Sequence, residues 1–512
     1  MPTLRLFLLL SFVTSAFAAA PQRLHLRERI KVDDAERYQL RERNVDWDPT
    51  KTAVVVCDMW DQHWCQCSTK RVGELAPRMN ELIAVARERG MLIIHCPSDT
   101  MEFYKDTPQR KLAQSAPVVE GKAPLERWRR LDPSREPPLP IDDSDGGCDD
   151  SPQPKSSRAW SRQHAALEIK DGDAITDSAE AYYLMRQRGI ENVLVMGVHT
   201  NMCVLGRPFS IRQLVYQGMN VVLVRDMTDT MYNPAKAPQV SHFRGTDLVI
   251  EHIEKYWCPS IVSSDLTGKS AFAFADDPRP HAVFVIGEDE YQTQTSLPQF
   301  ATDELEPRGI RCSFVFADER APNRFPLINT VEDADVLVLS VRRRPMPMEQ
   351  LDVIRRYCRA GKPLVAVRTA SHAFAPRGGE AVPEGCDTWL EFDTEILGAK
   401  YNGHYGRAMS GPSSQVWFTS PSDHPLTKQM PQGEFPVTDW LYKYSDVADS
   451  CRVLMSGRPN GGAEVEAASW INTKRGRVFY TMLGHPDAFQ QATFREFLRR
   501  GVFWALEKEA AK

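Results

Sequence analysis

A cysteine in residues 197–204 has the sequence context of a catalytic nucleophile. Residues 193–197 predict a strand, and a helical pattern begins at Cys203. A thiol at a helix N-terminus lies near free backbone N–H groups and the positive end of the helix dipole, both of which favour the reactive thiolate. The same N–H groups can hold an oxyanion when the thiolate attacks a carbonyl. The segment alone leaves two interpretations, a catalytic cysteine and a buried structural one.

Two charged residues could act together with Cys203. Asp58 follows the apolar run 52–57, and in an open parallel sheet the carboxyl ends of the strands line the ligand crevice. Its carboxylate could accept the thiol proton as a general base. Lys170 ends the predicted strand 165–170 at the same edge, where an ammonium would stabilise both the carboxylate and the thiolate. An ordinary surface charge is the competing interpretation of Lys170.

A parallel sheet is needed to bring these residues together. In the first half of the chain, apolar runs typical of strands alternate with apolar patterns typical of helices. The predicted strands are 52–57, 91–95, 193–197 and 220–224. The predicted helices are 75–89, 178–188 (with Asp177 as N-cap) and 203–217. This succession implies right-handed crossovers between parallel strands. The polar, Pro-rich residues 100–160 interrupt it, and we interpret them as a lid or substrate loop, with a solvated insertion as the alternative.

A second unit with the same alternation follows a polar, Pro-rich boundary at residues 264–278. Its predicted strands and closing helix lie at 281–287, 336–340, 363–367, 477–482 and 489–506. The predicted fold class is therefore α/β, with two open parallel-sheet, three-layer domains at 45–264 and 279–510.

Bulk composition narrows the class of protein. The chain has 512 residues, 42% hydrophobic content and a formal net charge of −5, so it is a multidomain globular protein without the basic stripe of a nucleic-acid binder. Residues 1–20 combine Arg5, an apolar run and Ala16-Phe17-Ala18, a pattern typical of a secretory signal peptide. We therefore expect a secreted or periplasmic protein without a membrane span. The count of 11 cysteines is odd, which leaves at least one thiol unpaired within a monomer.

Residues 52–258 resemble the isochorismatase-like cysteine hydrolases, a family that includes nicotinamidases and carbamoyl hydrolases. Three pieces match in order: Asp58 after an apolar strand, Lys170 before a helix, and the Gly-Val-X-Thr-Asn-X-Cys-Val segment that contains Cys203. The resemblance implies an Asp–Lys–Cys triad, a covalent acyl-enzyme and hydrolysis of a C–N bond. Because the cysteine is retained, we expect an amide, ureide or carbamoyl substrate.

The resemblance also implies details of the substrate site. It implies a cis peptide between Val198 and His199, with the oxyanion held by the N–H groups of His199 and Cys203. We add Asn201, Trp60 and His63 as candidate oxyanion or substrate contacts. Nicotinamidases carry an Asp-X-His metal motif where this chain reads Ser-Asp-Thr-Met at 98–101, so we predict neither a metal nor a cofactor.

Residues 281–508 resemble the trehalose-utilisation (ThuA-like) family, which is related to class I glutamine amidotransferases. The matching pieces include residues 336–340, 361–367, 422–425 and 481–486, and the terminal segment around Trp504. An amidotransferase needs a cysteine after 361–367, but Arg368 stands there and provides no nucleophile. The resemblance implies a carbohydrate-related role, with Arg368, His372, His404 and His485 as a candidate site; three purely structural histidines are the alternative.

These patterns support one function over two others. We predict an exported cysteine hydrolase whose partners are a small amide or ureide and, at the second domain, a carbohydrate. A non-catalytic ligand-binding protein is the first alternative, and an enzyme whose main activity is sugar chemistry in the second domain is the other. Assembly into a homo-oligomer stays open.

Overall fold

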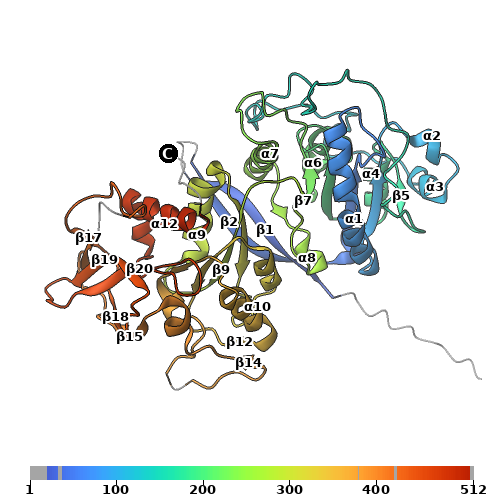
Figure 1. Ribbon diagram of the computed structural model, residues 1–512. Helices are drawn as coiled ribbons and strands as arrows, with labels where there is room; N and C mark the ends of the chain where they lie inside the picture. The colour runs from blue at the N-terminus through green and yellow to red at the C-terminus, as the bar shows by residue number, and fades with distance from the viewer. Residues whose placement is uncertain (1–19, 33–36, 379, 420–423, 508–512) are drawn as a thin grey trace, which may run out of the picture.

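The chain forms two α/β lobes joined by a long N-terminal hairpin (Figure 1). The computed structural model describes residues 20–32, 37–378, 380–419 and 424–507. The predicted signal peptide falls, except for residue 20, outside these described residues. The predicted α/β class and the order of the two domains are confirmed, although both sheets are mixed and not wholly parallel.

The first domain contains an eight-stranded sheet in the order β2-β1-β8-β7-β6-β3-β4-β5. Its strands are β1 (Gln22–Lys31), β2 (Tyr38–Trp47), β3 (Thr52–Cys57), β4 (Leu92–Cys96), β5 (Ala174–Ile175), β6 (Asn192–Val198), β7 (Asn220–Asp229) and β8 (Ser260–Ile261). Its helices are α1 (Gln66–Glu88), α2 (Met101–Tyr104), α3 (Pro108–Gln114), α4 (Glu180–Gln187), α5 (Cys203–Gly206), α6 (Ile211–Tyr216), α7 (His242–Tyr256) and α8 (Ser264–Thr267), with the short 3₁₀ turn η1 (Pro49–Lys51).

Strand β3 lies in the middle of this sheet because all six of its residues are apolar or small and fit between two helical layers. Every residue of β3 is buried. Ala53 and Val55 pack with the cluster that includes α4 to α7, whereas Val54 and Val56 pack with α1 on the other face. Alternating side chains thus pack against the helices on opposite faces of the sheet, as expected for a parallel strand covered on both faces.

The hairpin β1–β2 connects the two domains. β1 pairs with β8 of the first sheet through Arg27 and Ser260. Other contacts of the hairpin reach the second domain, where the His25 ring stacks on Phe316 at 5.0 Å between centroids and the N–H of Leu40 donates to Gln299. The first sheet therefore begins upstream of residue 45, and the hairpin lies between the lobes in Figure 1.

The second domain contains a nine-stranded sheet in the order β10-β9-β11-β13-β21-β20-β19-β16-β17. Its strands, with the two small side sheets, are β9 (His281–Gly287), β10 (Arg311–Phe316), β11 (Val336–Val341), β12 (Met346–Pro347), β13 (Leu364–Val367), β14 (Cys386–Asp387), β15 (Lys400–His404), β16 (Ser414–Phe418), β17 (Phe435–Val437), β18 (Tyr442–Ser445), β19 (Cys451–Pro459), β20 (Glu466–Asn472) and β21 (Val478–Thr481). Its helices are α9 (Thr293–Phe300), α10 (Met348–Arg359), α11 (Pro486–Gln490) and α12 (Ala492–Ala505), with the short turns η2 (Ala301–Leu305), η3 (Glu306–Arg308), η4 (Ile328–Asp333), η5 (Arg368–His372) and η6 (Asp393–Leu397).

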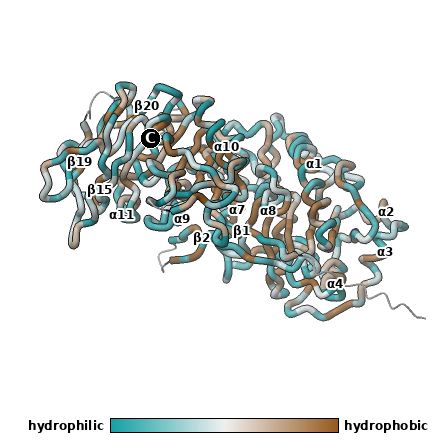
Figure 2. Tube along the Cα trace, turned by 90° about the horizontal axis from the view of Figure 1, so that it is seen from below, coloured by the Kyte–Doolittle hydropathy of each residue, from teal (hydrophilic) through white to brown (hydrophobic). Residues whose placement is uncertain are grey.

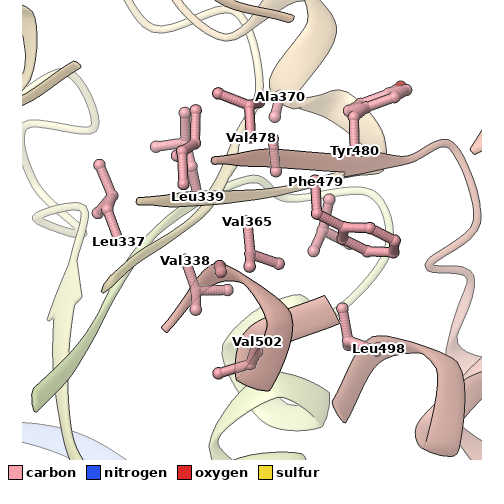
Figure 3. Packing of buried hydrophobic residues seen from close by; sticks show 14 of the residues in the cluster. Leu337, Val338, Leu339, Val365, Ala370, Val478, Phe479, Tyr480, Leu498 and Val502 are labelled. Atoms are coloured by element: carbon pink, nitrogen blue, oxygen red, sulfur yellow. The ribbon is translucent and has the colours of Figure 1, made fainter. Parts of the chain in front are cut away.

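Half of the second sheet is parallel and half antiparallel. Strands β10, β9, β11, β13 and β21 run parallel, whereas β20, β19, β16 and β17 pair antiparallel. Helix α12 covers the parallel half, where Leu498 and Val502 lie beside Phe479 and Val365 (Figure 3). Apolar segments gather inside both lobes and polar ones follow the outer turns (Figure 2).

Two predicted elements of the first domain differ from the structure. The helix predicted over 203–217 is split into α5 and α6, since Pro208 cannot donate a helical hydrogen bond. Residues 165–170, predicted as a strand, form turns, and the strand β5 comes only after them. Within the described part of the chain, no helix has the length and apolar character needed to cross a membrane.

Candidate active site

Asp58 lies fully buried at the carboxyl end of the central strand β3. Its backbone takes a left-handed conformation with φ of 47°, which turns the chain sharply after the strand. One carboxylate oxygen accepts a hydrogen bond from the N–H of Ser98 at 2.7 Å. The other accepts from Nε of Arg207 at 3.2 Å. The carboxylate is therefore held in one orientation from two sides.

Cys203 meets Asp58 at this edge. Strand β6 is the neighbour of β3, and it ends in a cis peptide between Val198 and His199, in agreement with the family resemblance. Cys203 is 8% exposed, and its thiol lies close enough to the Asp58 carboxylate for the charge of Asp58 to act on it. Among the described residues, the N–H groups of His199 and Cys203 donate to no other group, so both are free to bind an oxyanion.

The electrostatics of this pair differ from the prediction of a thiolate. Burial raises the pKa of the Cys203 thiol well above its usual range, and the neighbouring Asp58 raises it further, whereas Arg207 opposes both. Burial also raises the pKa of Asp58, again against the effect of Arg207. Because α5 has only four residues, its dipole is too weak to reverse the effect of burial on the thiol. The resting cysteine is a neutral thiol beside its base.

Lys170 does not reach this pair, which corrects its predicted placement. Its side chain is 54% exposed and its ammonium pairs with Glu168 at 2.8 Å. It lies in a turn before β5 and not at the end of a buried strand. Arg207 is the cation beside Asp58, and its pKa is raised, because Asp58 and Cys203 outweigh the cost of burial. The spacing of four residues from Cys203, one helical turn, is the sequence signal that could have found Arg207.

Aromatic rings form a wall near His199. Trp60 and Trp160 stack at 4.2 Å between centroids, and the His63 ring lies 5.1 Å from that of His199. Burial lowers the pKa of His63 to about 4, so its ring is neutral at physiological pH. His199 Nε2 is 2.6 Å from the hydroxyl of Ser68. The predicted contacts Trp60, His63 and His199 thus come together.

Asn201 has an internal role in place of the predicted substrate contact. Its amide nitrogen donates to Asp143 at 2.7 Å and to the carbonyl of Met231 at 3.1 Å, and its oxygen accepts from the N–H of Met231 at 3.0 Å. These bonds engage both the nitrogen and the oxygen of the side-chain amide. Asn201 therefore anchors the turn before Cys203 to the long segment 100–160.

The segment 100–160 packs across the site as an ordered cover. The N–H of Arg129 donates to the carbonyl of Gly206 at 2.7 Å. A Cβ on residue 206 would lie 2.7 Å from the Trp128 indole, so only glycine allows this approach. Arg207 lies 5.5 Å from the Trp128 ring centroid. The segment thus places an aromatic side chain, which the sequence patterns did not single out, against the cation of the site.

A disulfide and ion pairs fix the far end of this segment. Cys65 and Cys148 are joined, and Asp149 accepts two hydrogen bonds from Arg71 at 2.8 and 2.9 Å. Asp150 accepts from backbone N–H groups at the start of α1. Two groups of potential metal ligands occur here among the described residues, Cys65/Cys148/Asp150 and Cys67/Asp149/Asp150. The disulfide, the arginine and the helix start already engage most of these atoms, so we assign no metal to them.

The second domain holds a buried cation among aromatic rings. Arg368 follows β13 with φ of 46°, has no exposed surface, and donates to Asp439 at 2.7 Å. Its guanidinium carbon lies 4.0, 4.9 and 5.2 Å from the ring centroids of Tyr291, Trp440 and Tyr442. Nε and Nη2 of Arg368 have no hydrogen-bond partner among the described residues.

The three predicted histidines of this domain surround the same rings. His404 and His485 lie 6.5 and 6.3 Å from the Trp440 ring, and His372 lies 5.6 Å from the Tyr442 ring. The structure thus brings Arg368 and the histidines from three separate segments into one cluster. Trp440 and Tyr442, at its centre, were missed because neither stands in a recognisable motif.

The comparisons with known proteins agree with this division of the chain. Residues 282–505 match the model of a family described as ThuA, trehalose utilisation. The second domain is similar to this family, and we call it the ThuA-like domain. Among curated proteins, none matches this chain. A ThuA-like protein of Bacteroides uniformis is 15% identical, with 46% of this chain and 96% of that chain covered and a TM-score of 0.35.

Other solved structures resemble the first domain. A cysteine hydrolase of Pseudomonas syringae pv. phaseolicola is 16% identical, with 43% of this chain and 92% of that chain covered and a TM-score of 0.27. An isochorismatase-family protein of Burkholderia thailandensis is 16% identical, with 43% and 94% covered and a TM-score of 0.25. The chain is thus distantly similar to isochorismatase-like hydrolases in one half and to ThuA-like proteins in the other.

Proposed function

We propose that the first domain hydrolyses a C–N bond of a small amide, ureide or carbamoyl compound through a covalent thioester on Cys203. One observation carries this proposal: the Cys203 thiol lies beside the buried carboxylate of Asp58, which Arg207 holds in place. A nucleophile paired with a base that a third group orients is the arrangement used in covalent hydrolysis. The limited exposure of the thiol favours a small substrate.

The first half-reaction forms the thioester. Asp58 takes the thiol proton while the sulfur bonds to the substrate carbonyl carbon, and the carbonyl electron pair moves onto oxygen. The free N–H groups of His199 and Cys203 would bind that oxyanion. When the C–N bond breaks, the departing nitrogen takes the proton from Asp58 and leaves as an amine or ammonia.

The second half-reaction consumes water. Asp58, again a carboxylate, takes a proton from water, and the resulting hydroxide oxygen bonds to the thioester carbonyl. Breaking the C–S bond releases the acid, and the sulfur recovers its proton from Asp58. Arg207 offsets the negative charge that Asp58 and Cys203 share, so it is a positioning residue that makes proton exchange between them easier.

The test is a panel of small amides and ureides followed by intact-protein mass spectrometry. The wild type should turn over at least one compound and carry a transient acyl adduct, and Cys203→Ala should do neither. Cys358→Ala, which alters another buried free cysteine on α10, is the matched control and should behave like the wild type. Turnover that persists in Cys203→Ala would exclude the mechanism, and labelling of every other thiol but not Cys203 would favour a binding protein.

We propose further that the protein is exported, on the basis of residues 1–20. The pattern Ala16-Phe17-Ala18 predicts cleavage after residue 18. Expression of the full chain with fractionation and N-terminal sequencing tests this. A mature N-terminus near residue 19 outside the cytoplasm is the expected result, and an uncleaved cytoplasmic chain would contradict it.

A second candidate function is carbohydrate binding by the ThuA-like domain. The convergence of His404 and His485 on Trp440 favours it, since an aromatic face flanked by hydrogen-bonding groups suits a sugar ring. Titration of mono- and disaccharides against the wild type and Trp440→Ala tests this candidate. Sugar turnover that survives in Cys203→Ala would instead make the second domain the main enzyme.

A further inference from the structure

The loops at the carboxyl edge of the second sheet carry an unusual concentration of arginines. Strands β9, β11, β13 and β21 all end at this edge, where ligands of open parallel sheets bind. The run Arg342-Arg343-Arg344 follows β11 directly, and Arg368 follows β13. Two of these, Arg343 and Arg368, have positive φ angles of 50° and 46°, a conformation that costs free energy and concentrates at functional sites.

A cavity of about 250 Å³ lies beside this run. Its charged lining consists of four guanidinium groups and two carboxylates: Arg342, Arg343, Arg344, Arg377, Asp289 and Glu380. Three of the remaining lining residues are prolines, Pro345, Pro376 and Pro383. The cavity therefore carries an excess of positive charge.

Partners inside the protein satisfy only part of this positive charge. Arg342 pairs with Glu290 at 2.6 Å, and Arg344 lies 3.4 Å from Asp289. Arg343 instead donates to the carbonyl of Pro376 at 3.0 Å, and it forms no ion pair with any carboxylate of the described residues. Because a guanidinium in a partly buried site is stabilised by an opposite charge, Arg343 provides the free binding capacity of the cavity.

We propose that this cavity binds an oxyanion group, a carboxylate, phosphate or sulfate, carried by a small polar molecule. The planar fork of an arginine matches two oxygens of such a group. The volume lies below the roughly 300 Å³ at which pockets for drug-sized ligands begin, so it suits a charged substituent and little more. The backbone of Arg343 joins the cavity to the histidine cluster, because its N–H donates to the carbonyl of His372 at 3.2 Å.

The proposal implies that the ligand of the ThuA-like domain carries an anionic group. It is independent of the proposed cysteine hydrolase, since none of its residues belongs to the first domain. A neutral sugar would leave Arg343 without a counter-charge, whereas a sugar acid or sugar phosphate would satisfy it.

Isothermal titration of the full chain at constant ionic strength tests the proposal. The probes are inorganic sulfate, inorganic phosphate, glucuronate and, as the neutral counterpart, glucose. At least one anion should bind saturably, and glucose should not compete for the cavity. The probe that binds most tightly identifies the kind of oxyanion.

Variants connect this binding to the cavity. Arg343→Asn, which keeps a residue that tolerates positive φ, and the exposed Arg377→Gln should each weaken binding by about tenfold or more. Arg356→Gln is the matched control, since Arg356 is exposed on α10 and pairs with Glu332 away from the cavity. Absence of saturable anion binding would overturn the proposal, and so would equal weakening by Arg356→Gln, which indicates general surface charge.

Discussion

The guanidinium of Arg207 lies 3.2 Å from the carboxylate of Asp58, although 149 residues separate them in the chain. Arg207 follows Cys203 by four residues, so the short helix α5 and the residue that caps its end present the thiol and the cation to the end of β3. The cation of the site therefore comes from the same turn as the nucleophile, and not from the strand region around Lys170.

Replacement of Arg207 tests this arrangement. Arg207→Met should lower kcat/KM by about 100-fold, because a charge that stabilises the reacting groups is lost. Since Arg207 lowers the pKa of both Asp58 and Cys203, its loss should move thiol alkylation by iodoacetamide to higher pH. Arg207→Lys keeps the charge, so its kcat/KM and its alkylation profile should lie between those of the wild type and Arg207→Met. An alkylation profile of Arg207→Met that coincides with the wild type would contradict the role.

Lys170 provides the converse test. Lys170→Ala removes a half-exposed ammonium paired only with Glu168, so activity should stay within about twofold of the wild type and the free energy of unfolding within about 0.5 kcal/mol. Parallel assays of Lys170→Ala and Arg207→Met check this. A loss in Lys170→Ala as large as in Arg207→Met would mean that the lysine reaches the thiol in solution.

Sequence reasoning found the elements that bury apolar residues and missed contacts made by loops. The run 52–57 coincides with β3 because its six apolar or small residues fit only a covered strand. The meeting of Asp58 and Cys203 could be predicted because each lies just beyond such a strand, and the carboxyl ends of parallel strands lie at one edge of the sheet. The contact of Trp128 with Arg207 depends on how the segment 100–160 folds back, which no periodicity encodes, whereas Arg207 itself could have been found from its spacing to Cys203. The antiparallel strands β16 to β20 were missed because their half-exposed residues give weak patterns.

Glu136 should make the stability of the first domain acid-sensitive. Burial works against its ionisation, but hydrogen bonds from His252, Arg212 and Trp257 outweigh this effect and hold the pKa of Glu136 at about 2. A carboxyl whose folded pKa lies below its unfolded value, near 4.5, stabilises the fold above that value and loses the contribution as pH falls toward 2. The loss should reach about 3 kcal/mol.

Urea unfolding between pH 5 and about 2 measures this contribution. Glu136→Gln should be less stable than the wild type at pH 5, and its free energy of unfolding should fall less steeply with acid. Glu88→Gln, a change on the partly exposed end of α1, is the control and should leave the slope unchanged. Parallel curves for Glu136→Gln and the wild type would show that Glu136 is not the titrating group.

Arg368 should be essential for the stability of the ThuA-like domain because it is the counter-ion of a buried carboxylate. Arg368→Leu leaves Asp439 charged and without its guanidinium, at a cost of about 3–5 kcal/mol. Asp439 keeps the N–H groups of Gly484 and His485, so Arg368→Leu combined with Asp439→Asn removes the unpaired charge and should recover part of the loss.

Urea unfolding measured by tryptophan fluorescence gives the free energies of unfolding of both variants. Alkylation of Cys203 should be unchanged in each variant, since that thiol lies in the other domain. A double variant no more stable than Arg368→Leu would show that Arg368 acts by packing against Tyr291 and Trp440, and not as a counter-ion.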